Sequence, residues 1–322
     1  MKIRGLALAV MACCLFAGQE CAAQARGCDY RLITHGADNA FWRVVSKGAR
    51  DAALSLGCTV QISMFNGDLK AQQQAFIKAV AERPDGIALS LPNDELFDKA
   101  VTAAQAAGVP VIAVNNDDSR GEAGNSRLCY IGQDDEHAAY SLGLKLIEMA
   151  QRKNFDIFSA KTVLFSELPG SNFNNKRIAG MARALSEFGM QAPHVVDLSR
   201  SGEYSSAMSS YMDAGSAGLI VVAIGGAVAE YLGDAVKSSG RKPETLVAGA
   251  FDVGPRTIAA IRAGYIAATV DQQQYLQGFY SVYTLWLYGK YGLAADVDTG
   301  RNVINNSDEL RRIEELSAEN VR

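Results

Sequence analysis

The chain has 322 residues, of which 48% are hydrophobic and 20% are charged. This length is sufficient for two domains, and the composition is that of a folded globular protein, which excludes a disordered chain. The formal net charge of −4, without any block of lysines and arginines, argues against binding to nucleic acid or to anionic lipid.

The first 25 residues have the three parts of a secretory signal peptide. Lys2 and Arg4 form a charged start, residues 6–17 form an apolar segment, and Ala23-Gln24-Ala25 matches a small-residue cleavage site. The apolar segment is shorter than the roughly 20 residues that span a bilayer, so a membrane anchor is the weaker interpretation. We therefore expect residues 1–25 to be removed on export to the periplasm.

Three cysteines remain after this removal: Cys28, Cys58 and Cys129. An oxidising compartment allows a pair of them to form a disulfide. Cys28 and Cys58 each precede a predicted strand, and these strands should be parallel neighbours, so one alternative is a Cys28–Cys58 bridge with a buried Cys129 thiol. The other is three unpaired cysteines. Lipid attachment at Cys21 is disfavoured, because the residues before it form a poor lipidation signal.

Strand-like and helical segments alternate along the first part of the exported chain. Strands are expected at 30–34, 59–62, 86–89 and 109–114, and helices at 41–56, 69–82 and 94–107. In the first helix the apolar residues fall on one face, and Gly57 ends it. This alternation predicts a parallel sheet with helices on both faces.

The pattern begins again after about residue 134. Strands are expected near 162–166, 194–198, 218–223, 246–250 and 266–270, and helices near 135–151, 173–188, 203–213, 226–239, 254–263 and 272–290. The predicted fold class is α/β, with two Rossmann-like, doubly wound parallel-sheet lobes. We expect one lobe from 28–133 plus 273–300 and the other from 134–271 plus 301–322. Crossovers near Gln133, Asp271 and Gly300 would then form a three-strand hinge, which permits closure without a flexible linker.

Polar and aromatic residues follow the predicted strands. In open α/β sheets, ligands bind beyond the carboxyl ends of the strands. The loops there contain His35, Asn39, Phe41 and Trp42, then Asn115 and Asn116, then Asn175 and Arg177, and finally Asp252 and Gln272. Amides and carboxylates offer paired hydrogen-bonding groups to vicinal hydroxyls, and aromatic rings cover the apolar face of a sugar. A small polyhydroxylated ligand, a sugar or polyol, is therefore expected.

Each of these residues also has a purely structural interpretation. Asp38 or Asn39 can cap the first helix, and Asp252 can cap a later one. One of Phe41 and Trp42 is expected in the core, because adjacent helical residues point about 100° apart. The segment 115–118 can be an ordinary turn.

Signatures of catalysis are missing from the sequence. It contains no G-x-S-x-G, no P-loop and no G-x-G-x-x-G. His35, His137 and His194 are dispersed without the spacing of metal ligands. We expect a protein that is not an enzyme and that uses no cofactor or metal.

From about residue 29 to residue 300 the chain resembles the type I periplasmic sugar-binding proteins, the ribose- and galactose-binding group that serves ABC importers. The motifs that carry this resemblance are Phe41-Trp42, Pro84-Asp85-Gly86-Ile87, Ala107 to Ile112, Tyr130 to Asp134, Gly249 to Asp252, and Asp271 to Gly278. The chain departs from the ribose pattern where Asn115-Asn116 stands for an Asp-Arg pair, Asn175 for an arginine, and Gly225-Gly226 for Asn-Asp. Ribose itself is therefore not the expected ligand.

We expect the ten residues named above to line one cleft between the lobes, and the resemblance implies this for all of them except Arg177. It also implies a membrane partner, which is the permease of an ABC importer or, alternatively, a sensor kinase or chemoreceptor. A repressor of the same fold would need an N-terminal helix-turn-helix, and the signal peptide occupies that place. A monomer that does not bind nucleic acid is expected.

Overall fold

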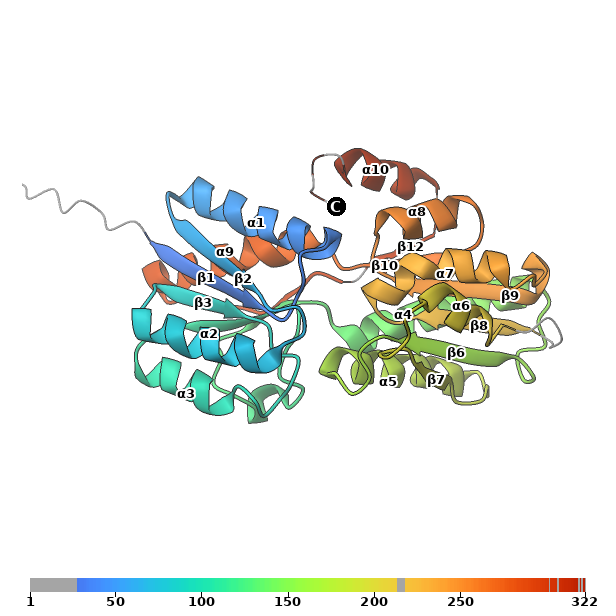
Figure 1. Cartoon of the computed structure of the whole chain (residues 1–322), viewed down its shortest axis with the longest axis horizontal. Coiled ribbons are helices and arrows are strands. Elements are labelled where there is room, and N and C mark those ends of the chain that lie inside the picture. Colours follow the sequence, from blue (N-terminus) through green and yellow to red (C-terminus); the bar gives the residue numbers. More distant parts are fainter. Residues whose placement is uncertain are drawn as a thin grey trace, which may run out of the picture.

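Two α/β lobes make up the computed structural model, which describes residues 28–212, 218–300, 302–305, 307–317, 319 and 321 (Figure 1). The expected signal peptide, residues 1–25, lies outside the described residues. Within the described part, no helix combines the length and the apolar character that crossing a bilayer requires.

The first lobe is built on a six-stranded parallel sheet in the order β11-β5-β4-β3-β1-β2. Its strands are β1 (Asp29–Thr34), β2 (Thr59–Met64), β3 (Gly86–Leu89), β4 (Val111–Val114), β5 (Tyr130–Gly132) and β11 (Val297–Asp298). Its helices are α1 (Ala40–Leu56), α2 (Leu69–Glu82), α3 (Asp98–Ala106) and α9 (Gln274–Tyr291), with a short 3-10 turn, η1 (Gly121–Ala123).

Alternation along β1 divides the core of this lobe into two layers. Leu32 packs with Val45 of α1 and Leu285 of α9 on one face of the sheet. Its neighbour Ile33 packs with Phe76 of α2, and α3 covers the same face. Successive strand residues point to opposite faces, so both faces of a doubly wound sheet must be apolar and covered.

The second lobe repeats this plan with the sheet order β12-β10-β9-β8-β6-β7. Its strands are β6 (Lys161–Ser166), β7 (His194–Asp197), β8 (Leu219–Ala223), β9 (Leu246–Phe251), β10 (Ala268–Asp271) and β12 (Asn302–Ile304). Its helices are α4 (Asp135–Arg152), α5 (Asn172–Glu187), α6 (Tyr204–Ser209), α7 (Gly226–Ser238), α8 (Pro255–Arg262) and α10 (Ser307–Ser317), with the 3-10 turn η2 (Pro243–Thr245). The edge strand β12 runs antiparallel to β10, a feature that the sequence patterns did not predict.

The chain passes between the sheets three times. The passages join β5 to α4, β10 to α9, and β11 to β12. After them, α4 packs against α5 in the second lobe, and α9 packs against α1 in the first. The crossovers expected near Gln133, Asp271 and Gly300 correspond to these three passages.

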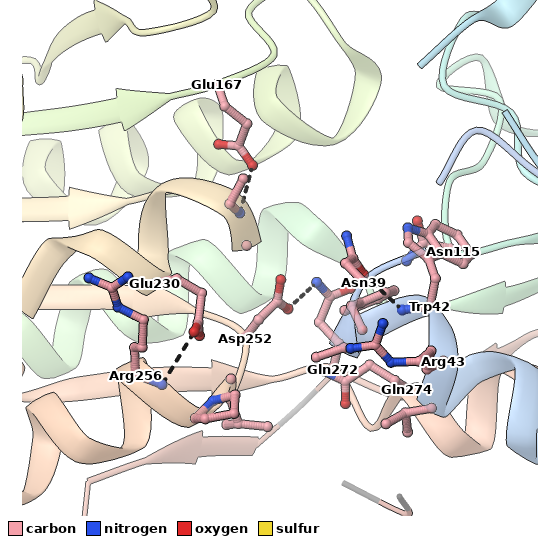
Figure 2. A pocket seen from close by; sticks show the side chains of 18 of the residues that line it. Asn39, Trp42, Arg43, Asn115, Glu167, Glu230, Asp252, Arg256, Gln272 and Gln274 are labelled. Carbon is pink, nitrogen blue, oxygen red and sulfur yellow. Dashed lines mark hydrogen bonds between the residues drawn. The ribbon is translucent and has the colours of Figure 1, made fainter. Parts of the chain in front are cut away.

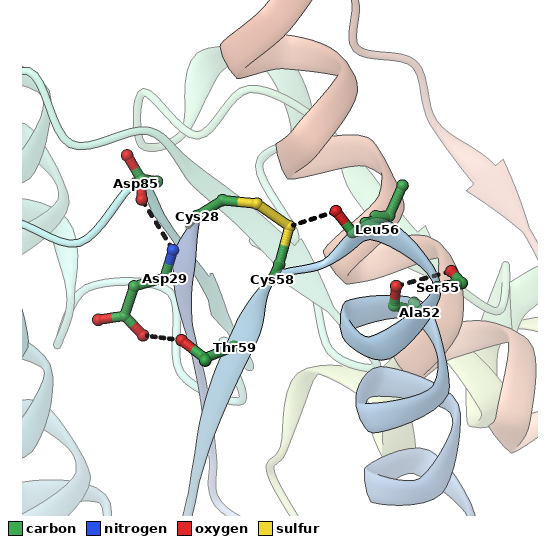
Figure 3. Close-up of a disulfide and its surroundings, with 8 residues drawn as sticks. All are labelled: Cys28, Asp29, Ala52, Ser55, Leu56, Cys58, Thr59 and Asp85. Carbon is green, nitrogen blue, oxygen red and sulfur yellow. Dashed lines mark hydrogen bonds between the residues drawn. A yellow bond between two sulfur atoms is a disulfide. The ribbon is translucent and has the colours of Figure 1, made fainter. Parts of the chain in front are cut away.

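A disulfide joins Cys28 to Cys58, directly before β1 and β2 (Figure 3). The parallel register pairs Asp29 with Thr59, so the two preceding cysteines are adjacent, with a Cα–Cα distance of 4.6 Å. The bridge fastens the edge strand β2 to the sheet, and Cys129 remains a buried free thiol. Of the two alternatives left open by the sequence, the structure has the bridge.

Removing this disulfide should destabilise the protein. The bridge closes a segment with a sequence separation of 30, for which loop-entropy arguments predict a loss of about 2–4 kcal/mol. We expect urea unfolding to give this loss for the double variant Cys28→Ser/Cys58→Ser. Dithiothreitol should destabilise the native chain and Cys129→Ala but not the double variant. A native chain that is insensitive to the reductant would contradict this account.

Candidate ligand-binding cleft

A cavity of about 750 Å³ lies between the lobes, where the carboxyl ends of both sheets meet (Figure 2). Nine of the ten residues expected there line it: His35, Asn39, Phe41, Trp42, Asn115, Asn116, Arg177, Asp252 and Gln272. The cavity therefore receives amides, carboxylates, a guanidinium and aromatic rings from both lobes.

The start of α1 presents an amide and two rings to the cavity. Asn39 caps the helix, because its Oδ1 accepts the backbone N–H of Trp42 at 3.1 Å, yet its side chain stays exposed on the cavity wall. Trp42 is only 5% exposed and belongs to the core, whereas Phe41 is half-buried. Their rings meet edge to face at 5.2 Å, an arrangement that fixes the aromatic surface of the cleft.

His35, directly after β1, is held in one orientation. Its Nδ1 lies 2.9 Å from the hydroxyl of Ser90, and its ring meets Trp42 edge to face at 5.3 Å. Burial lowers the pKa of His35 to about 4. The ring is therefore neutral at neutral pH.

Two asparagines follow β4 and form a linked pair. Asn115 has a φ of 64°, a left-handed conformation that asparagine tolerates better than most residues. Its Nδ2 donates to Oε1 of Gln277 in α9 at 3.0 Å, and its Oδ1 accepts from Asn116 at 2.7 Å. The Oδ1 of Asn116 is buried and accepts no hydrogen bond from the described residues.

Arg177 of α5 is buried and tightly held. Its Nε donates to Asp135 at 2.7 Å, its Nη1 donates to the carbonyl of Ile224 at 2.7 Å, and its guanidinium lies 4.1 Å from the ring centroid of Phe251. Burial raises the pKa of Asp135, and the guanidinium of Arg177 opposes that rise. These contacts fix the guanidinium at the wall of the cavity.

The structure does not bring Asn175 to the cavity. Its side chain is exposed, whereas Phe173 and Arg177 line the cavity from one face of α5. Residues four apart share a helix face, and a residue two positions away points to the other side. The neighbouring Asn174 points inward and donates to Ser166 at 2.8 Å.

Asp252 follows β9 with a φ of 75°. Its Oδ1 accepts a hydrogen bond from the side-chain amide of Gln272, which is buried. It does not cap α8, whose N-cap is Gly254 without a side-chain hydrogen bond. Burial raises the pKa of Asp252 to about 6, although Arg177 and Gln272 oppose the rise. The capping interpretation of Asp252 is therefore wrong in this structure.

Several residues that were not predicted from the sequence also line the cavity: Glu167, Tyr204, Glu230, Tyr231 and Arg256. Glu167 directly follows β6, so the strand-end argument that found Asp252 could have found it. The other four lie on helices, where no strand-end signal exists.

One side chain links the lobes away from the three passages. Asn172, at the start of α5, donates from Nδ2 to the carbonyls of Leu91 and Asp117, at 3.3 and 3.2 Å, and to Oδ1 of Asp94 at 2.6 Å. These acceptors belong to the first lobe. The hydrogen bonds of Asn172 therefore hold the two lobes together in this conformation, separately from the three passages.

Comparison with known proteins decides the family. Residues 30–292 match the sequence profile of a family described as the periplasmic binding protein domain. The chain belongs to the periplasmic binding protein family. Among the described residues of this binding protein, no cluster of three His, Cys, Asp or Glu side chains could hold a metal ion.

Relatives of this binding protein span nearly its whole length. A xylose/arabinose-binding protein of Sulfolobus acidocaldarius is 27% identical, over 86% of this chain and 71% of the relative. A periplasmic sugar-binding protein from Legionella pneumophila is 25% identical with a TM-score of 0.74, covering 84% of this chain and 99% of that one. A carbohydrate transporter protein from Acidothermus cellulolyticus, in complex with myo-inositol, shares the fold with a TM-score of 0.78 at 23% identity, over 92% and 100% of the two chains.

The raised pKa of Asp252 should make stability depend on pH. The folded state keeps this proton up to about pH 6, whereas the unfolded state releases it near the ordinary value of 3.8. The contribution of Asp252 to stability therefore falls as pH rises from about 4 through 6. We expect urea unfolding to show Asp252→Asn gaining stability relative to the native chain between pH 4 and pH 7.

The exposed Glu315 of α10 provides a control. The variant Glu315→Gln should show no such change over the same pH range. A stability difference between Asp252→Asn and the native chain that stays constant with pH would contradict the burial of this carboxylate.

Proposed function

We propose that this periplasmic binding protein captures one small polyhydroxylated ligand, a sugar or polyol, between its lobes and delivers it to the permease of an ABC importer. The proposal is carried by one observation: a cavity between the lobes collects amides, carboxylates and aromatic rings from both of them. Hydroxyl pairs need donors and acceptors together, and the C–H face of a sugar needs a ring surface.

Closure of the lobes is part of the proposal. Three short passages allow the lobes to rotate about one another while the sheets stay intact. Asn39, Phe41 and Trp42 would approach the ligand from the first lobe, and Arg177 and Asp252 from the second. Each lobe would then complete the site only when the other is in place.

The names of the relatives support a sugar ligand and transport. The Sulfolobus relative is a xylose/arabinose-binding protein, and the Legionella protein is described as part of an ABC sugar transporter. We propose accordingly that the chain acts as a binding protein without catalysis, as a monomer, in the periplasm. The sensory alternative shares the same cleft, but no observation favours it over transport.

Calorimetric titration tests the proposal directly. The panel is D-xylose, L-arabinose, D-arabinose and myo-inositol, and at least one member should bind and raise the melting temperature. Asp252→Ala should then weaken binding about tenfold or more, because hydrogen bonds to a charged group are worth about 1.5–3 kcal/mol each.

Asn175→Ala is the matched control, since Asn175 is exposed outside the cavity, and its affinity should equal that of the native chain. A panel in which no member binds would contradict the proposed function. Unchanged affinity in Asp252→Ala with a lower melting temperature would remove Asp252 from the site.

A further inference from the structure

The positive charges that line the cavity are already neutralised by the protein. Each of its three arginines forms an ion pair with a carboxylate outside the lining, namely Arg43 with Asp38, Arg177 with Asp135, and Arg256 with Asp234. His35 is neutral at neutral pH, because burial lowers its pKa to about 4. No cation of the lining is therefore left without a carboxylate of its own.

Three carboxylates of the lining have only neutral donors among the described residues (Figure 2). Glu167 accepts the backbone N–H of Ala227 at 3.3 Å, and Asp252 accepts the amide of Gln272. Glu230 accepts the backbone N–H of Arg256, in the first turn of α8, at 3.2 Å. The second oxygen of Glu167, Oε2, is buried and has no hydrogen-bond partner in the described part of the chain.

Two of these carboxylates occupy the place where an anion would otherwise bind. The N-terminus of a helix attracts anions, because its backbone N–H groups point outward. At the N-terminus of α7, a Cβ on Gly225 would overlap the carboxylate of Glu167, and a Cβ on Gly226 would overlap that of Asp252. The two glycines thus let the protein's own carboxylates fill this position.

We infer that the cleft rejects anionic sugars, such as uronic acids and sugar phosphates, and accepts neutral or cationic polyols, with Glu167 as the residue that sets this charge selectivity. The inference rests on the proposed function and narrows its ligand class. A ligand hydroxyl or ammonium is compatible with the carboxylates of Glu167, Asp252 and Glu230, because ionised carboxylates only accept hydrogen bonds. A ligand carboxylate there meets the like charges of Glu167, Asp252 and Glu230, which repel it.

Matched ligands that differ in charge test the inference. Calorimetric titrations at pH 7 compare D-galactose, D-galactosamine and D-galacturonate, and compare myo-inositol with its monophosphate. We expect the neutral or amino member of each set to bind at least tenfold more tightly than the acidic member. Glu167→Gln keeps the size of the side chain and removes its charge, and should reduce this discrimination severalfold. The exposed control Glu315→Gln should leave it unchanged.

An acidic member that binds as tightly as its neutral counterpart, or discrimination that is unchanged in Glu167→Gln, would overturn the inference.

A second measurement needs no ligand: a carboxyl carbon NMR titration of Asp252 in the native chain and in Glu167→Gln. Loss of a neighbouring negative charge should lower the pKa of Asp252, and an unchanged pKa would also overturn the inference. If no sugar binds but this pKa falls, the proposed function fails while the charge arrangement stands.

Discussion

The three passages of chain between the sheets are bonded to one another, and the position of the cleft depends on this. Gln273 donates to the carbonyl of Thr299 at 2.8 Å, and Gln277 donates to the carbonyl of Gln272 and to the hydroxyl of Thr299, each at 3.3 Å. The remaining passage is joined to these through the backbone N–H of Thr299, which donates to the carbonyl of Gly132 at 2.8 Å. Short passages joined in this way hold both sheets with their carboxyl ends toward one space. Residues directly after the central strands, such as His35, Asn115 and Asp252, therefore face the same cavity.

The same glutamines connect the cavity wall to the passages. Gln277 accepts from Asn115, which in turn accepts from Asn116, so a chain of amides runs from the cavity wall to the passages. The interlobe bonds of Asn172 lie apart from the passages and hold the lobes together by a second route. Buried acceptors without partners, such as Oε2 of Glu167, destabilise a protein unless they gain a donor.

Much of this arrangement could be predicted from the sequence, because alternating apolar patterns determine which segments become strands and where they end. Asp252 and the Asn115–Asn116 pair were found in this way. The ends of strands do not indicate which residues of a helix face the cavity. The length of the loop before a helix determines how the helix is rotated about its own axis. That rotation turns Asn174 inward and Asn175 outward, and the sequence gives no measure of it. Tyr231 and Arg256 reach the cavity from helices for the same reason. The edge strands β11 and β12 are too short to produce a periodic signal.

A crystal structure of the protein with a sugar from the panel would test the central claim most directly. We expect the sugar to lie in the cavity between the lobes, with Asp252 and Arg177 on one side and Asn39 and Trp42 on the other. Its hydroxyls should donate to the carboxylate of Asp252. A sugar that contacts one lobe alone, or that lies outside this cavity, would contradict the account.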